Sequence, residues 1–198
     1  MFKRLAITAG ALLVATAPAF AHLDPGHSGS FLAGVSHPLF GLDHIVVMVA
    51  VGLWAATIGG RAVWVVPASF VGAMAVGYLL AIGGVSLPFV EPVVLASVVA
   101  LGLLIAAAVR VPPAIGGVLV GLFAVFHGHA HGGELGLASA LPFGLGFAVS
   151  TALLHSAGIG IGLLLGSGIG MRENVGKVVA RVLGGVAAAI GLALAFAS

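Results

Sequence analysis

The sequence predicts an all-α, polytopic integral membrane protein. Of its 198 residues, 61% are hydrophobic and only 6% are charged, and the mean hydropathy is +1.30. Soluble domains are about 45–50% apolar and about 25% charged, so this chain cannot cover a globule with polar side chains. The apolar runs are too long for the strands of a membrane barrel, and no segment alternates with period two. The net charge of +2 is too small to indicate binding to nucleic acid.

The first segment, residues 1–21, has the pattern of a secretory signal peptide. It combines two basic residues, an apolar run and an A-x-A cleavage site at residues 19–21. The alternative is an uncleaved first membrane helix, but the apolar run is shorter than the roughly 20 residues that a span needs. Cleavage would leave residues 22–198 as a single membrane transport domain that begins at His22.

Six transmembrane helices are predicted in that domain. They cover about residues 41–58, 62–82, 92–108, 113–126, 138–165 and 175–197. The fifth is longer than a bilayer requires, so it is expected to tilt, kink or protrude. The 32 glycines predict close helix packing through small residues.

Basic residues lie on alternate loops between these helices. Beyond the signal peptide they are Arg61, Arg110, Arg172, Lys177 and Arg181. The positive-inside rule places their loops in the cytoplasm. Both ends of the domain are therefore expected in the periplasm (N-out/C-out), in a bacterial inner membrane. The cleaved signal peptide predicts the same orientation from different residues.

A polar stretch at the start of the first span contains His37, Asp43 and His44. If the chain is helical from His37, then Gly41, His44 and Met48 share its face. Two imidazoles, a carboxylate and a thioether would then form a capture site for a divalent metal ion. Alternatively, Asp43 orients an imidazole, or a His-Asp pair only caps a helix at the membrane interface.

A second polar stretch is expected in the loop after the fourth span. His127, His131 and Glu134 lie at spacings of four and three, which is one helical face, while His129 points elsewhere. Glycines beside them could instead break the helix. A solvated polar loop is the alternative, but three histidines in five residues favour metal binding. Residues 37–44 and 127–134 are both expected on the periplasmic side, where they should converge within reach of one metal ion.

Three further residues are candidate metal ligands. Glu91 is the one charged residue of its loop, although it could simply start the third span. His155 lies within a span and needs a polar partner there, which could also be a structural hydrogen bond. His22, with its own free amine after cleavage, could chelate a metal ion.

The two stretches resemble a known family. His37-Pro38-x-x-Gly41-x-Asp43-His44 and Phe126-His127-Gly128-x-Ala130-His131-Gly132-x-Glu134 are similar to the two signature motifs of the HupE/UreJ nickel permeases. The resemblance implies uptake of Ni²⁺, or Co²⁺, from periplasm to cytoplasm for hydrogenase or urease maturation. It carries a transport role over to His37, Asp43, His44, His127, His131 and Glu134, and less directly to Glu91 and His155.

The sequence gives less support to other functional classes. No H-E-x-x-H, G-x-S-x-G or Walker A motif occurs, so neither an enzyme nor an ATP-driven pump is expected. The absence of cysteine excludes thiolate ligands and disulfides. A non-transporting membrane chaperone or sensor for metal is the main alternative, and an intramembrane metalloenzyme is a third. The expected partners are a divalent metal ion as cargo, the lipid bilayer and accessory proteins of hydrogenase or urease, with no permanently bound cofactor.

Overall fold

A computed structural model describes residues 30–135, 138–166 and 173–197, and these residues are helical without strands. The elements are α3 (Ser30–Ser36), the 3₁₀ turn η1 (His37–Leu39), α4 (Leu42–Ile58), α5 (Ala62–Ile82), α6 (Val90–Ala106), α7 (Pro113–Gly133), α8 (Ala140–Gly166) and α9 (Glu173–Ala197). The all-α prediction is confirmed. The proposed signal peptide and His22 lie outside the described residues.

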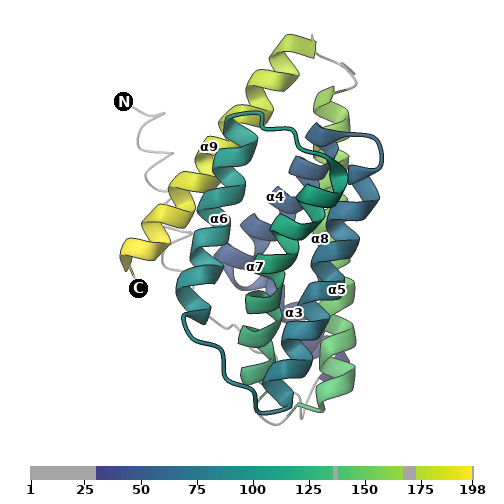
Figure 1. Ribbon diagram of the computed structural model, residues 1–198, viewed down its shortest axis with the longest axis vertical. Helices are drawn as coiled ribbons and strands as arrows, with labels where there is room; N and C mark the ends of the chain where they lie inside the picture. The colour runs from purple at the N-terminus through teal and green to yellow at the C-terminus, as the bar shows by residue number, and fades with distance from the viewer. Residues whose placement is uncertain (1–29, 136–137, 167–172, 198) are drawn as a thin grey trace, which may run out of the picture.

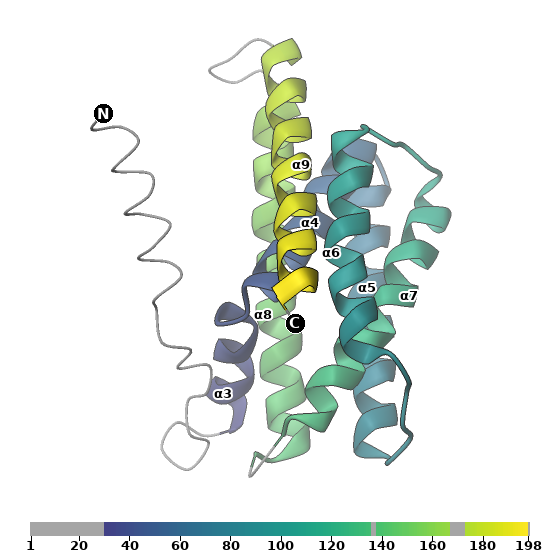
Figure 2. The ribbon, with the colours of Figure 1, turned by 90° about the vertical axis from the view of Figure 1, so that its left-hand side faces the viewer.

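The long helices run alongside one another in a bundle (Figure 1). The most extensive contacts join α5 to α7, α6 to α9, and α4 to α8, and the short α3 packs on α8. Figure 2 shows α9 beside α6 on the outside of the bundle, with α3 at the lower end of α8.

Glycine lets these pairs approach closely, as predicted. A Cβ atom at Gly128 of α7 would overlap the carbonyl oxygen of Met74 in α5. At Gly158 of α8, a Cβ atom would overlap the carbonyl oxygen of Val49 in α4. Backbones in contact through small residues are the usual way in which helices pack in a bilayer.

Four helices are long and apolar enough to cross a membrane: α5, α7, α8 and most of α9. The α3–α4 pair passes the same test only as one span bent by 80°, and α6 is apolar but has 17 residues. Large apolar side chains such as Trp64 and Leu79 are exposed on the outer faces of the bundle, where lipid would cover them. The chain is thus a multi-pass membrane protein, while six spans and their orientation remain predictions.

The predicted first span, residues 41–58, agrees with α4, but the helix does not extend back to His37. α3, which the sequence analysis did not predict, is followed by the 3₁₀ turn, and Gly41 is extended (φ −92°, ψ 116°) before α4 begins. Pro38 lies in the 3₁₀ turn, where its missing N–H is tolerated. His44 and Met48 share a face of α4, but His37 does not lie on that face, so this part of the conditional prediction is wrong.

The fourth span also differs, because it was expected to end near residue 126 with a loop after it. α7 continues to Gly133, and the N–H group of Glu134 bonds to the carbonyl of His131 at 3.3 Å. The glycines of this stretch do not break the helix. His127 and His131 therefore lie one turn apart on the same helix.

Candidate metal centre

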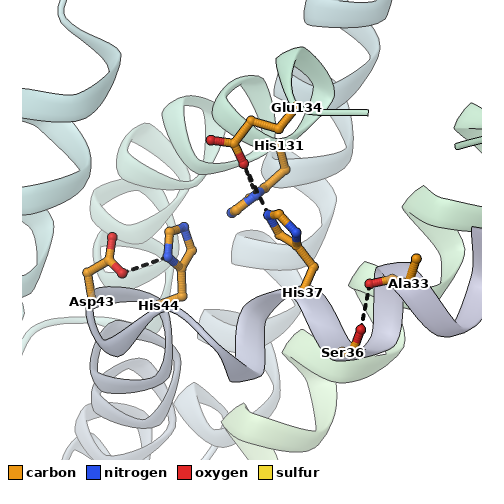
Figure 3. Close-up of polar contacts among 7 residues, drawn as sticks. All are labelled: Ala33, Ser36, His37, Asp43, His44, His131 and Glu134. Atoms are coloured by element: carbon orange, nitrogen blue, oxygen red, sulfur yellow. Dashed lines mark hydrogen bonds and ion pairs between the residues drawn. The ribbon is translucent and has the colours of Figure 1, made fainter. Parts of the chain in front are cut away.

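Three side chains from two distant parts of the chain meet beside the bend between α3 and α4 (Figure 3). Nε2 of His37 lies 3.1 Å from Oε2 of Glu134, and Nδ1 of His131 lies 3.4 Å from the same oxygen. One ligand atom from each residue lies within 4.8 Å of the other two. The expected convergence of residues 37–44 with residues 127–134 is therefore observed. We call this group the outer cluster.

The outer cluster depends on the break in the first span. The 3₁₀ turn carries His37 toward α7, while the last turn of α7 presents His131 and then Glu134. The two histidine side chains are only 9% and 3% exposed, whereas Glu134 is 47% exposed. A cation could therefore reach the carboxylate from outside and find nitrogen donors behind it.

The Glu134 carboxyl remains ionised in this arrangement. Hydrogen bonds from His131 and then His37 lower its pKa well below the usual range, although partial burial opposes the shift. A charged carboxylate beside two imidazoles is a good first ligand for a divalent cation.

Asp43 holds His44 in one orientation. Its Oδ1 lies 2.9 Å from Nδ1 of His44. An ionised carboxylate only accepts hydrogen bonds, so this Nδ1 carries the proton and Nε2 keeps its lone pair. A side chain at Gly41 would intrude here, since its Cβ atom would lie 2.7 Å from Nδ1 of His44. This geometry favours the orienting role for Asp43.

His127 and His155 are also oriented by a hydrogen bond from Nδ1. Nδ1 of His127 lies 3.1 Å from the carbonyl oxygen of Phe123, and Nδ1 of His155 lies 2.8 Å from that of Met48. Carbonyl oxygens accept, so both Nδ1 atoms donate and both Nε2 atoms carry lone pairs. Metal-binding histidines are usually oriented by such a bond from the second nitrogen.

The second ring nitrogen, Nε2, of several described histidines is buried without a hydrogen-bond partner, which is unusual in a protein interior. Among the described residues, Nε2 is buried without a hydrogen-bond partner in four histidines: His44, His127, His131 and His155. Burying a polar atom without a partner costs roughly 1–3 kcal/mol. A role as metal ligands would use these lone pairs, and that role stays a prediction.

The imidazole rings of four histidines form a row. The ring centroids are 4.7 Å apart for His37 and His131, 4.4 Å for His131 and His44, and 5.6 Å for His44 and His127. At these spacings, the ring nitrogens of neighbouring histidines lie close to one another. We call these four residues the histidine row.

A model of the family described as HupE/UreJ protein matches residues 10–194. The chain belongs to the HupE/UreJ family. Protein HupE of Rhizobium leguminosarum bv. viciae is 44% identical over 195 residues, which cover 98% of this chain and 97% of that protein. No solved structure matches the chain.

Aromatic side chains surround the histidines of this HupE/UreJ protein, and sequence reasoning missed them. Phe147 lies 4.2 Å from the His131 ring. Phe70 contacts both of the deepest histidines, with its ring centroid 5.5 Å from that of His127 and 5.0 Å from that of His155. A phenylalanine in an apolar helix carries no signal of such a place, so the sequence alone did not reveal it.

Other predicted residues of the HupE/UreJ chain lie outside the outer cluster. Glu91 is exposed at the start of α6, beside a groove between α6 and α9. His129 points away, as expected, and its Nε2 donates to the carbonyl oxygen of Val85 at 2.7 Å. Met48 is fully buried, and its carbonyl oxygen contacts His155. Metal binding by any of these side chains stays a prediction.

Proposed function

We propose that this protein takes up Ni²⁺, or Co²⁺, across the bacterial inner membrane and supplies hydrogenase or urease maturation. The observation that carries the proposal is the outer cluster, where His37, His131 and Glu134 offer ligand atoms within 4.8 Å of one another. Nitrogen and oxygen donors without thiolates suit Ni²⁺, Co²⁺ or Zn²⁺ better than Cu⁺. Membership in the HupE/UreJ family supports a permease role for nickel or cobalt.

Capture begins at the half-exposed carboxylate of Glu134. The ion exchanges its first water molecules for that oxygen and for the imidazoles of His37 and His131. Replacing water stepwise keeps the ion coordinated, which avoids the cost of a bare charge in an apolar interior.

Inward movement follows the histidine row. His44 and His127 each present a buried Nε2 lone pair, and each is the next ring along from a donor already engaged. An ion can therefore form a new bond before it breaks an old one. His155 would receive it beyond Phe70.

The membrane potential supplies a sufficient driving force. A divalent cation gains roughly 4.6 kcal/mol per 100 mV when the cytoplasm is negative, which corresponds to accumulation on the order of a thousandfold. Neither ATP hydrolysis nor a counter-ion is required.

Uptake of ⁶³Ni²⁺ in a bacterial host that lacks its own nickel transporters tests the proposal. The His37→Ala and Glu134→Gln variants should take up much less ⁶³Ni²⁺ than the wild type at matched expression. His129→Ala is the matched control, because it removes an imidazole from the same helix as His131 but outside the outer cluster. Full uptake by both cluster variants would refute this route.

A non-transporting metal chaperone or sensor is the second candidate. The Phe70 ring contacts both His127 and His155, which is how a closed binding site would end. Flux into proteoliposomes that contain a trapped Ni²⁺ indicator separates the two functions. A transporter delivers the ion to the indicator, whereas a sensor binds it at the outer face only.

A further inference from the structure

We propose that a basic pocket at the opposite end of α4 binds the phosphate head group of an anionic phospholipid. The pocket is a cavity of about 270 Å³. It lies where the last residues of α4, α6 and α8 meet the first turns of α9, near the upper end of the bundle in Figure 1. His44 and Thr57 are 13 residues apart on α4, so roughly 20 Å separates the histidines from this pocket.

The charge of the pocket has one sign. Arg110, Lys177 and Arg181 all line it, and no acidic residue is among its described lining residues. All three basic side chains are exposed. An anion that entered the pocket would meet three cationic groups from two different parts of the chain.

Arg181 is held in place for such a contact. Its Nε donates to the carbonyl oxygen of Ala106, the last residue of α6, at 2.8 Å. That bond satisfies one helix-end carbonyl and uses one of the five N–H groups of the guanidinium. The planar fork of arginine matches two oxygens of a phosphate, and the bonds are charge-assisted.

The remaining lining indicates an amphiphile rather than a small anion. It consists mainly of small and apolar residues, and Gly166 of α8 faces open space. Exposed apolar side chains, among them Val178 and Val182, continue along α9 from this end. A phospholipid places its phosphate at the arginines and its acyl chains along this apolar surface, and basic pockets between membrane helices bind acidic head groups in this way.

Native mass spectrometry of the full chain tests this, after release from nanodiscs that hold equal amounts of phosphatidylglycerol and phosphatidylcholine with the same acyl chains. The wild type should retain phosphatidylglycerol preferentially. An Arg110→Gln/Arg181→Gln variant should retain it roughly tenfold less, as expected for the loss of charge-assisted hydrogen bonds. Arg61→Gln is the charge-matched control, because Arg61 is a basic residue near the same end that does not line the pocket.

A second pair of variants tests the cavity while all the arginines remain. Gly166 lines the pocket, and a Cβ atom there would meet no other atom within 4 Å. Gly166→Leu should therefore fold, fill the cavity and lose the lipid. Gly160→Leu is the control on the same helix, since its Cβ is equally unobstructed and it does not line the pocket.

The lipid assignment is wrong if the wild type retains both lipids equally, or if Arg61→Gln loses phosphatidylglycerol as strongly as the double variant. It is also wrong if inorganic phosphate added to the nanodiscs displaces the lipid, since the pocket would then select a free anion. The measurement uses no metal, so a failure of nickel uptake leaves its outcome unaffected.

Discussion

The two ends of α4 handle positive charge in opposite ways. At its start, several imidazoles present buried Nε2 lone pairs, and the carboxylates of Glu134 and Asp43 lie beside them. Near its end, guanidinium and ammonium groups are exposed around a cavity, and none of the described residues that line it is acidic. The first end can replace the water around a cation, whereas the second end repels a cation and attracts an anion.

The chain geometry differs in the same sense. The end that carries the histidines is built on an interrupted helix, with an 80° bend between α3 and α4. At the other end, regular helices stop at short connections, and Arg181 covers one of the last carbonyl groups. Irregular backbone inside a membrane is tolerated where it lines a site that uses it. The bend between α3 and α4 is therefore part of the candidate metal site.

Removing the imidazole of His131 should have the largest effect on metal uptake. His131 contacts His37, His44 and Glu134, so His131→Ala interrupts both the outer cluster and the histidine row. We expect ⁶³Ni²⁺ uptake to fall on the order of a hundredfold, because even residues that only orient metal ligands are typically worth 10–100-fold. Uptake above half of the wild-type rate, at equal amounts of folded protein in the membrane, would show that the row is not the route.

The Gly41→Ala variant tests the bend before α4 and the Asp43–His44 pair beside it. The new Cβ atom would lie 2.7 Å from Nδ1 of His44 and 2.9 Å from Oδ1 of Asp43, so it would separate this pair. We expect uptake to fall roughly tenfold, since a metal-binding imidazole would lose its orienting carboxylate. Gly72→Ala in α5 is the control, because a Cβ atom there meets nothing within 4 Å. Equal uptake by the two variants would remove Asp43 from the mechanism.

Lowering the external pH should distinguish the contribution of the imidazoles to uptake from that of the Glu134 carboxylate. Protons compete with metal for imidazole lone pairs, so uptake should decline as the external pH is lowered. Because the pKa of Glu134 is lowered, its carboxylate stays charged around and above the usual glutamate value of about 4.3. Glu134→Gln should therefore reduce uptake at every pH in this range, including neutral pH. Wild-type uptake by Glu134→Gln at neutral pH would contradict the assignment of this carboxylate as a metal ligand.

Much of the framework was predictable because apolar length and spacing determine it. The bounds of α5 agree with the predicted span of residues 62–82. The convergence of residues 37–44 with residues 127–134 followed from placing both stretches on one side of the membrane, and the helical spacing of His127 and His131 is observed.

The bend and the inner aromatic residues were not predictable in the same way. Proline near a run of apolar residues can begin a helix or interrupt one, and local sequence does not distinguish the two. Tertiary packing decides here, because α3 is held against α8 through Gly34 and Gly146, where Cβ atoms would overlap backbone carbonyls. Likewise, Phe70 becomes a neighbour of His127 and His155 only when α5, α7 and α8 assemble.

The smallest effect is expected from a single charge at the arginine end. Arg61→Gln removes one of several basic residues that the positive-inside rule places in the cytoplasm. Because the remaining ones share the bias, the orientation should persist and uptake should change less than about twofold. Alkaline phosphatase fused after the last residue should be active in both the wild type and the variant, since that enzyme folds only in the periplasm and the C-terminus is expected there. An inactive fusion of the wild type would reverse the orientation, and the histidine row would then open toward the cytoplasm and favour metal export or sensing.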